Sequence, residues 1–248
     1  MGKPLFIQYV TLKYGIDKDI KKFPFNVPLI KQFEEIVFNK PVTFIIGENG
    51  SGKSTLLEAI AVSYGFNPEG GSKNFNFKTK ETHSNFYKFI KIGKSFNKAE
   101  DGYFLRAESF YNVASNIDKI NKDGLRGPLY DSYGGKSLHN QSHGESFLSL
   151  LKHRLGGNGL YIFDEPESAL SPMKLLELMV IIDNLVNNNS QFIISTHSPI
   201  LMAYPKAEIY EIDNGKLKLT AFEETNHFSI TKYFMLNYER MIRNLGIK

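Results

Sequence analysis

The fold of this chain is decided by the stretch Gly47-Glu48-Asn49-Gly50-Ser51-Gly52-Lys53-Ser54, which matches the phosphate-binding pattern G-x-x-x-x-G-K-[ST]. The β-branched and aromatic run Val42–Ile46 precedes it and predicts a buried strand, whereas the helix formers that begin at Thr55 predict a helix. Glycines let backbone N–H groups close around phosphate oxygens, and a helix N-terminus adds positive potential. In this setting the stretch predicts a bound nucleoside triphosphate rather than an ordinary glycine-rich turn.

Each side chain of this loop has an expected role in holding the phosphates. We expect Lys53 to reach the β and γ phosphates and the Ser54 hydroxyl to bind Mg²⁺. The remaining predicted phosphate-binding residues follow the loop in order: Gly47, Glu48, Asn49, Gly50, Ser51, Gly52 and Thr55.

The composition fits one large α/β domain. The chain has 248 residues, a hydrophobic fraction of 42% and no cysteine, which excludes disulfides, thiolate metal sites and cysteine nucleophiles. The N-terminus lacks the apolar core of a signal peptide, and the longest apolar stretch, 175–186, contains two acids and is too short to span a bilayer. We therefore expect no membrane span and a cytoplasmic protein.

Two later apolar runs also end in polar residues. Leu160–Phe163 leads into Asp164 and Glu165, the arrangement of a Walker B strand, although a strand that ends in an ordinary polar turn remains the alternative. Asp164 would bind Mg²⁺, and Glu165 would orient and deprotonate the attacking water. Gln191–Ser195 leads through Thr196 to His197, which either senses the γ-phosphate or is a structural histidine.

The stretch Ser142-His143-Gly144-Glu145-Ser146 supports two compatible interpretations. Ser142 and Glu145 form an S-x-x-E capping box that would start a helix over 145–155. A capped helix N-terminus with a glycine beside it also presents free N–H donors to an anion.

The order of these motifs resembles the nucleotide-binding domain of the ABC ATPase superfamily, with Ser142–Ser146 in place of its signature motif, 168–171 similar to its D-loop and His197 similar to its switch histidine. The stretches 106–110, 141–147 and 198–205 resemble compact bacterial AAA-family ATPases related to the SMC and RecF branch. The resemblance implies a P-loop NTPase fold of α/β class. In that fold a mixed central sheet is flanked by helices, with an N-terminal antiparallel β portion and a small inserted lobe, here at about 66–140 of a single domain 1–248.

The same resemblance implies ATP hydrolysis with Mg²⁺ in a homodimer that encloses two nucleotides. Ser142, Gly144 and Glu145 of one chain would then cap the γ-phosphate held by the other. The signature departs from the superfamily pattern at His143, and no Q-loop glutamine is evident. Glu108 is the nearest candidate metal ligand, unless it forms an ion pair with Arg106.

A basic segment, Lys73–Lys98, holds seven lysines and one acid, so it carries a net charge of +6 within a chain of net charge +4. Aromatic residues alternate with these lysines. The pattern predicts either a nucleic-acid surface or antiparallel strands with inward rings and solvated lysines. Three functions therefore stay open: an ATPase linked to nucleic acid, the ATPase subunit of a transporter, and a nucleotide-dependent interaction switch.

Several further elements follow from local patterns. We expect strands over Leu5–Leu12 and Val27–Val37, β-hairpins and loops over 66–110, and a helix near 111–120. A helix is expected from Ser171-Pro172 to about residue 186, and a hairpin at Asn214-Gly215. One or two helices should close the chain.

Overall fold

A seven-stranded mixed sheet forms the centre of the molecule in this computed structural model, which describes residues 5–15, 19–72, 84–106 and 143–247. The five inner strands run parallel, and one antiparallel strand closes each edge. Across the sheet the order is β10 (Lys216–Leu219), β9 (Ala207–Asp213), β3 (Val42–Ile46), β8 (Gln191–Ser195), β7 (Gly159–Asp164), β6 (Asp101–Arg106) and β4 (Gly71–Ser72).

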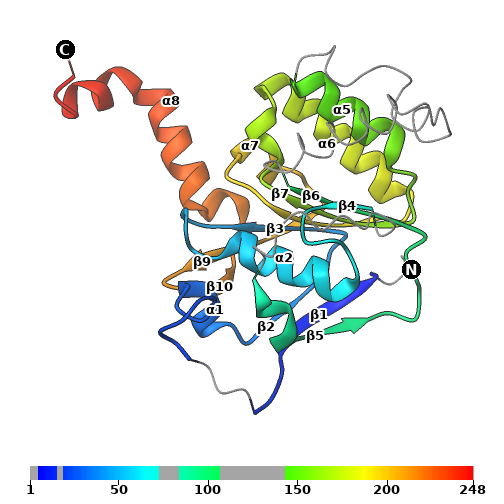
Figure 1. Ribbon diagram of the computed structural model, residues 1–248. Helices are drawn as coiled ribbons and strands as arrows, with labels where there is room; N and C mark the ends of the chain where they lie inside the picture. Colours follow the sequence, from blue (N-terminus) through cyan, green and yellow to red (C-terminus); the bar gives the residue numbers. More distant parts are fainter. Residues whose placement is uncertain (1–4, 16–18, 73–83, 107–142, 248) are drawn as a thin grey trace, which may run out of the picture.

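Helices cover both faces of this sheet (Figure 1). One face carries α5 (His143–Arg154), α6 (Pro172–Asn187) and α7 (Pro199–Met202), and the other carries α2 (Lys53–Tyr64) and α1 (Pro28–Gln32). Successive residues of a strand point to opposite faces. Phe44 and Ile46 accordingly join the core beneath α5 and α6, whereas Ile45 joins the core beneath α2.

A smaller antiparallel sheet lies beyond α2, in the order β2 (Glu35–Val37), β1 (Ile7–Leu12) and β5 (Ile90–Lys94). The buried side chain of Gln191 joins the two sheets, because its amide accepts from the N–H of Ile7 and donates to the carbonyl of Ile7, both at 2.9 Å. The predicted α/β class, with a mixed central sheet and an antiparallel β portion, is confirmed.

Two local predictions are wrong in part. Val27–Val37 is not one strand, because Pro28 starts the short helix α1 and only Glu35–Val37 is extended. Proline is well suited to a first helical position, and tertiary packing here overrides β propensity. In the region 66–110, β5 and β6 do not form a hairpin, because β5 pairs with β1 and β6 runs parallel to β7.

In the described part of the basic segment, residues 84–98, most aromatic rings point inward and the lysines are solvated, as the second of the two predictions for this segment states. Phe86, in the 3₁₀ turn η1 (Asn85–Phe89), is fully buried. Its lysines are exposed, and among its described aromatic residues Phe96 alone is strongly exposed, at 87%. Phe75 and Phe77 lie outside the described residues, as does the helix expected near 111–120, and the bounds of an inserted lobe stay a prediction.

The C-terminal region follows its local signals. Asn214 and Gly215 have φ values of 48° and 81° and connect β9 to β10 in the predicted hairpin. The 3₁₀ turn η4 (Phe222–Glu224) then leads into α8 (Asn226–Asn244), which is kinked at Asn237 and projects from the body (Figure 1). Every residue of α8 is at least partly exposed. Within the described ranges no helix combines the length and apolar character needed to cross a membrane.

Asp101 connects the central sheet to the end of α5. Its carboxylate accepts from Arg154 at 2.9 Å, from the Gly156 N–H at 2.9 Å and from the Tyr161 hydroxyl at 2.8 Å. Burial alone would raise the pKa of Asp101, but these hydrogen bonds and the charge of Arg154 together hold that pKa below its usual value.

Asp101→Asn should therefore lower the free energy of unfolding at pH 7 by about 1–3 kcal/mol, because hydrogen bonds to a charged group are lost. Because the pKa of Asp101 is lower in the folded protein, the charged carboxylate adds to the free energy of unfolding at pH values above the unfolded pKa of about 4. This contribution is lost as the pH falls through the folded pKa. The difference between the two proteins should therefore shrink on acidification. Urea unfolding from pH 7 to pH 3 measures it.

The control for this experiment is Glu177→Gln, which removes a carboxylate that lies 3.7 Å from Lys152 with both side chains about half exposed. It should leave the unfolding midpoint nearly unchanged. Equal losses in the two variants, or a loss at Asp101 that does not depend on pH, would contradict the assigned role of Asp101.

Candidate active site

The polar motifs predicted from the sequence meet at one edge of the central sheet. Neighbouring parallel strands end at the same edge, where α/β proteins bind ligands. The phosphate loop follows β3, Asp164 ends β7, and Thr196 and His197 follow β8, which lies between those two strands. Ser195 pairs in register with Ile45 on one side and with Asp164 on the other.

The phosphate loop requires glycine where it packs most closely. Gly47 has a φ of 152°, and a Cβ there would lie 2.9 Å from the Cβ of Ile212. Gly52 has a φ of 112°, and a Cβ there would lie 2.7 Å from Val27. The loop is thus held between β9 and the start of α1. Its outer residues Glu48, Asn49 and Gly50 are exposed, and Thr55 is half-buried in α2.

Lys53 lies inside this loop as predicted. Its side chain is buried, and its ammonium group donates to the carbonyls of Gly47 at 2.8 Å and Glu48 at 3.0 Å. Burial lowers the pKa of Lys53, although nearby carboxylates, first of all Glu165 and Asp164, act in the opposite direction. The ammonium group therefore lies among loop carbonyls and carboxylates at the strand ends, where a phosphate would meet it.

Asp164 and Ser54 lie together, as a shared metal site requires. The Ser54 hydroxyl donates to Oδ1 of Asp164 at 3.0 Å, and the Ser195 hydroxyl donates to the same oxygen. Burial raises the pKa of Asp164, against the effect of these hydrogen bonds and of Arg106. A carboxylate and a hydroxyl at this spacing offer the hard oxygen ligands that Mg²⁺ prefers, and a bound cation would offset the burial of the carboxylate. The residues present therefore fit a Mg²⁺ ion.

Glu165 directly follows Asp164 at the end of β7 and lies beside His197. Its Oε1 is 3.4 Å from Nε2 of His197. The backbone of Glu165 is left-handed, with a φ of 50°, and its N–H donates to the Ser195 hydroxyl at 3.1 Å. A non-glycine residue rarely adopts this conformation, which occurs preferentially at functional sites. Ser195 thus contacts both carboxylate residues of the site.

Glu167 belongs to the site but was not among the sequence predictions. It lies in the 3₁₀ turn η3 (Pro166–Ala169), and its Oε1 accepts from the backbone N–H of His197. Burial raises the pKa of this carboxyl group. The pattern Asp-Glu-Pro-Glu in 164–167 was the available signal, because a second acid two residues after Glu165 follows the same strand end.

His227, in the first turn of α8, is the second residue that the sequence analysis missed. Its Nε2 lies 3.3 Å from Nδ1 of His197. Burial lowers the pKa of His227, and the neighbouring His197 lowers it further. No spacing signal marks this residue, which is thirty positions from its neighbour in the sequence.

The described part of the signature stretch forms the start of α5, on the sheet face that also carries α6 and α7. Gly144 and Glu145 are in the first turn of α5, and a Cβ at Gly144 would lie 3.2 Å from the carbonyl oxygen of Ala169 and 2.9 Å from Lys174. The signature helix therefore packs against the predicted D-loop. Ser142 and Glu108 lie outside the described residues, so their predicted roles stay predictions. Arg106 forms an ion pair with Glu58 at 2.7 Å.

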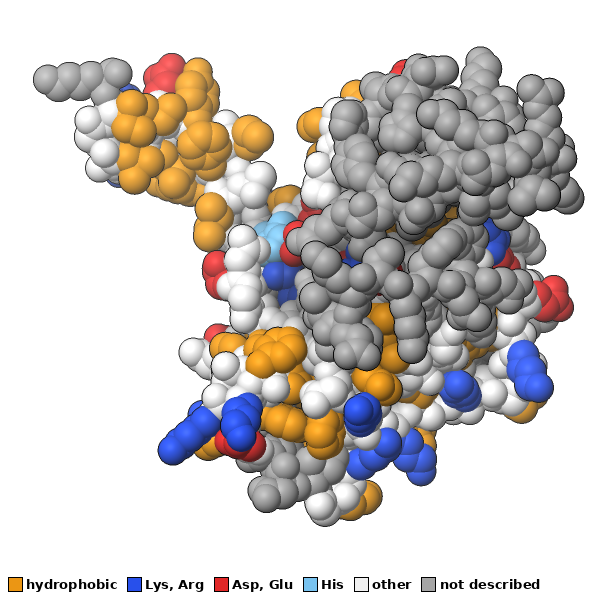
Figure 2. All heavy atoms as spheres, in the orientation of Figure 1, with side chains coloured by type: hydrophobic (Ala, Val, Ile, Leu, Met, Phe, Trp, Pro, Cys, Tyr) orange, Lys and Arg blue, Asp and Glu red, His pale blue; other side chains and the backbone are white. Residues whose placement is uncertain are grey.

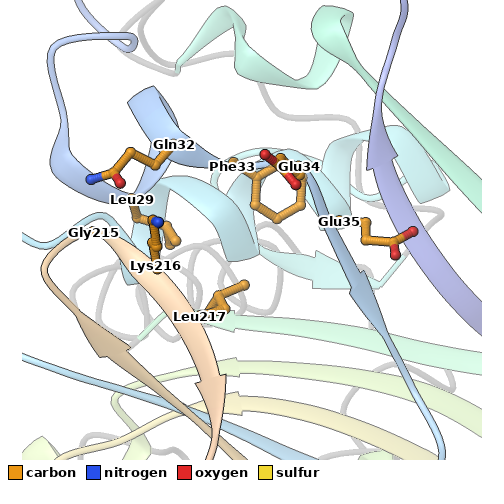
Figure 3. A pocket seen from close by; sticks show the side chains of 8 residues that line it. All are labelled: Leu29, Gln32, Phe33, Glu34, Glu35, Gly215, Lys216 and Leu217. Atoms are coloured by element: carbon orange, nitrogen blue, oxygen red, sulfur yellow. The ribbon is translucent and has the colours of Figure 1, made fainter.

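A separate hollow lies between α1, β2 and the β9–β10 hairpin (Figure 3). Leu29, Phe33 and Leu217 supply its apolar wall, and Glu34, Glu35 and Lys216 lie at its polar rim. None of the residues that line it belongs to the predicted nucleotide site.

The polar groups of the site have unused capacity to bind a polar ligand. Four of its buried polar atoms have no hydrogen-bond partner among the described residues: Ser51 Oγ, Glu167 Oε2, His197 Nε2 and His227 Nδ1. Buried polar atoms in folded proteins are normally paired, so such atoms around a glycine loop fit a polar ligand. Lys53 supplies positive charge, and Glu165 places a carboxylate 3.4 Å from Nε2 of His197, a group able to accept a proton.

The comparisons with known proteins agree with this arrangement. A family model described as "AAA domain" matches residues 18–150, which is 133 of the 248 residues. A second model, described as "AAA domain, putative AbiEii toxin, Type IV TA system", matches residues 146–203. Together the two models extend over the phosphate loop, Asp164, Glu165 and His197.

Two of the relatives are a transporter ATP-binding protein and a chromosome-maintenance protein. The energy-coupling factor transporter ATP-binding protein EcfA1 of Fusobacterium nucleatum is 28% identical over 86% of this chain and 80% of its own length. Structural maintenance of chromosomes protein 6 of Takifugu rubripes is 29% identical over 47% of this chain but only 10% of its own length.

A solved structure shows the same fold. It is that of cbiO1 from Clostridium perfringens, described as part of the ABC transporter complex cbiONQ. It has a TM-score of 0.51 at 17% identity and covers 98% of this chain and 100% of its own. The chain thus belongs to the AAA-domain family and is an ATPase.

Proposed function

We propose that the chain binds ATP with Mg²⁺ at residues 47–55 and hydrolyses it as a homodimer that encloses two nucleotides. The observation that carries the proposal is the adjacency of two pairs at one sheet edge. Ser54 lies 3.0 Å from Asp164, and Glu165 lies 3.4 Å from His197. The first pair would hold the metal ion and the second would act on the attacking water.

The chemistry divides among the residues of one chain. The loop N–H groups and Lys53 would bind the β and γ phosphates and offset their charge. Mg²⁺, when bound by Ser54 and Asp164, would neutralise charge on the phosphate oxygens. Glu165 would accept a proton from the attacking water, and His197 would orient that water and donate to the γ-phosphate.

The position of the signature stretch supports a dimer. Gly144 and Glu145 belong to α5, which packs against α6 and η3, whereas α2, the helix that continues the phosphate loop, lies on the other face of the sheet. A second protomer would bring its Ser142, Gly144 and Glu145 to the γ-phosphate of the first. Each composite site would then require both chains, and ATP would stabilise the dimer.

For the process that hydrolysis drives, we propose cytoplasmic nucleic-acid repair, maintenance or defence. The relative named as a chromosome-maintenance protein and the exposed lysines of the basic segment support this function. The ATPase subunit of a membrane transporter is the alternative, because the relative EcfA1 is a transporter ATP-binding protein. A nucleotide-dependent interaction switch is the third candidate, supported by the exposed apolar side chains of α8.

Glu165→Gln should lower the hydrolysis rate by on the order of a hundredfold, because general-base assistance is lost while the amide keeps the shape of the side chain. ATP should still bind, so a dimer should accumulate with ATP in light-scattering chromatography. Phosphate release measures the rate, and Glu177→Gln is the matched control on α6. Wild-type hydrolysis without an ATP-dependent dimer would refute both the base assignment and the enclosed dimer.

The composite site can be tested by mixing two inactive variants. Lys53→Ala removes the phosphate contact and Ser142→Arg blocks the signature, so each protein alone should be inactive. In an equimolar mixture, mixed dimers keep one intact composite site, and activity should return to about a quarter of the wild-type value if subunits pair at random. A mixture that contains mixed dimers but stays inactive would mean that both residues act on the same nucleotide within one chain.

Nucleic-acid binding should be visible as salt-dependent fluorescence anisotropy with DNA and RNA duplexes. Binding through phosphate contacts should weaken steeply between about 50 and 200 mM salt. Replacement of Lys88, Lys91, Lys94 and Lys98 by glutamine should reduce the salt slope by about one for each lost contact, whereas replacement of Lys216 and Lys218 on β10 should not. An absence of binding at low salt would remove this function and leave the transporter and switch alternatives.

A further inference from the structure

The first turn of α8 is fixed to the body of the protein, unlike the rest of that helix. Thr225 is fully buried, accepts from the N–H of Phe228 at 3.2 Å and donates to the carbonyl of Phe222 at 2.8 Å. The rings of Phe222 and Phe228 pack with their centroids 4.8 Å apart. These contacts hold His227, which lies between Thr225 and Phe228 in the sequence, at a defined place. Figure 2 shows histidine atoms beside acidic and basic side chains at the base of α8.

The ring of His227 contacts the one nitrogen of His197 that faces away from Glu165. Nε2 of His227 lies 3.3 Å from Nδ1 of His197, and Nε2 of His197 lies 3.4 Å from Oε1 of Glu165. A neutral imidazole has one N–H donor and one bare acceptor nitrogen. The contact between the two rings therefore couples their tautomers, since one facing nitrogen must donate and the other must accept.

The surroundings favour one of the two possible arrangements. If Nδ1 of His197 were the donor, its bare Nε2 would face the carboxylate of Glu165, two acceptors in contact. Nδ1 of His227 would then carry its proton, yet this buried nitrogen has no partner among the described residues. A buried donor without a partner is more costly than an under-used acceptor, and rarer in native structures. In the other arrangement Nδ1 of His227 is bare and the proton is on Nε2 of His197. That nitrogen also has no hydrogen-bond partner at ordinary length among the described residues, but the carboxylate of Glu165 faces it at 3.4 Å and attracts the proton.

We infer that His227 is a positioning residue for hydrolysis: it donates its Nε2–H to Nδ1 of His197 and so fixes His197 as the tautomer with its proton on Nε2. That proton is then directed at Glu165 and at the place of the γ-phosphate. The inference rests on the proposed role of His197 as γ-phosphate sensor and water-orienting group, because Nε2 is the ring nitrogen that faces Glu165 and would have to be the donor in that role. Partial burial and the neighbouring His197 ring lower the pKa of His227, which favours the neutral ring that this role requires.

Substitutions of equal size separate donation from packing. His227→Gln places an amide N–H group near the position of Nε2, whereas His227→Leu fills the space without a donor. The Leu variant should lower kcat on the order of tenfold with KM changed by less than about twofold, because a tautomer mixture weakens the hydrolytic step rather than ATP binding. The Gln variant should stay within about threefold of the wild-type kcat. His153→Leu, an exposed position on α5, controls for loss of a histidine and should have no effect.

A nucleotide-free measurement tests the inference apart from the proposed function. Two-bond ¹H–¹⁵N spectra of histidine-labelled wild-type protein distinguish protonated from bare ring nitrogens, and cross-relaxation between the two facing rings identifies them among the six histidines. We expect protons on Nε2 of both His197 and His227. A proton on Nδ1 of His197, or equal kcat values for the Leu and Gln variants, would overturn the inference. If the tautomers are as expected but Glu165→Gln hydrolyses ATP at the wild-type rate, the result would instead count against the proposed function alone.

Discussion

The parallel pairing of β7, β8 and β3 is the constraint on which the site depends. Ser195 is paired with Asp164 on β7 and with Ile45 on β3, so the Walker B acids and the phosphate loop lie on either side of one strand end. Because side chains alternate along a strand, a slip of one residue would turn the Ser195 hydroxyl away from Asp164 and Glu165. The fully buried residues of β8 and β3 oppose such a slip, since it would disturb the packing of both cores.

The same geometry explains what the sequence could predict. The phosphate loop, Asp164, Glu165 and His197 each follow a short buried strand directly, and such local signals survive in the fold. Their meeting follows from parallel pairing, a general rule. Glu167 could have been found from its place beside Glu165. His227 could not, because its contact with His197 depends on how η4 and the first turn of α8 pack. The splitting of β5 and β6 between two sheets likewise depends on tertiary pairing that local alternation does not encode.

The site concentrates features that a stable core avoids. Glu165 has a left-handed backbone, and the buried atoms without partners among the described residues, which include Glu167 Oε2 and His197 Nε2, all lie at or beside this sheet edge. Conformations and unpaired groups of this kind cost free energy, of order 1–3 kcal/mol each, and persist only where the surrounding structure enforces them. Here the enforcement comes from the Ser195 hydroxyl and from the paired strands. The apolar cores on both faces of the sheet thus hold a strained polar edge in place.

α8 gives this edge a connection to the surface. Its first turn is anchored by Thr225, but farther along the helix large apolar side chains are exposed, and Figure 2 shows them gathered on its outer part: Ile230, Tyr233, Phe234, Met235, Leu236 and Tyr238. The contact between His227 and His197 is already 3.3 Å long, so a displacement of a few tenths of an ångström at the base of α8 would weaken it.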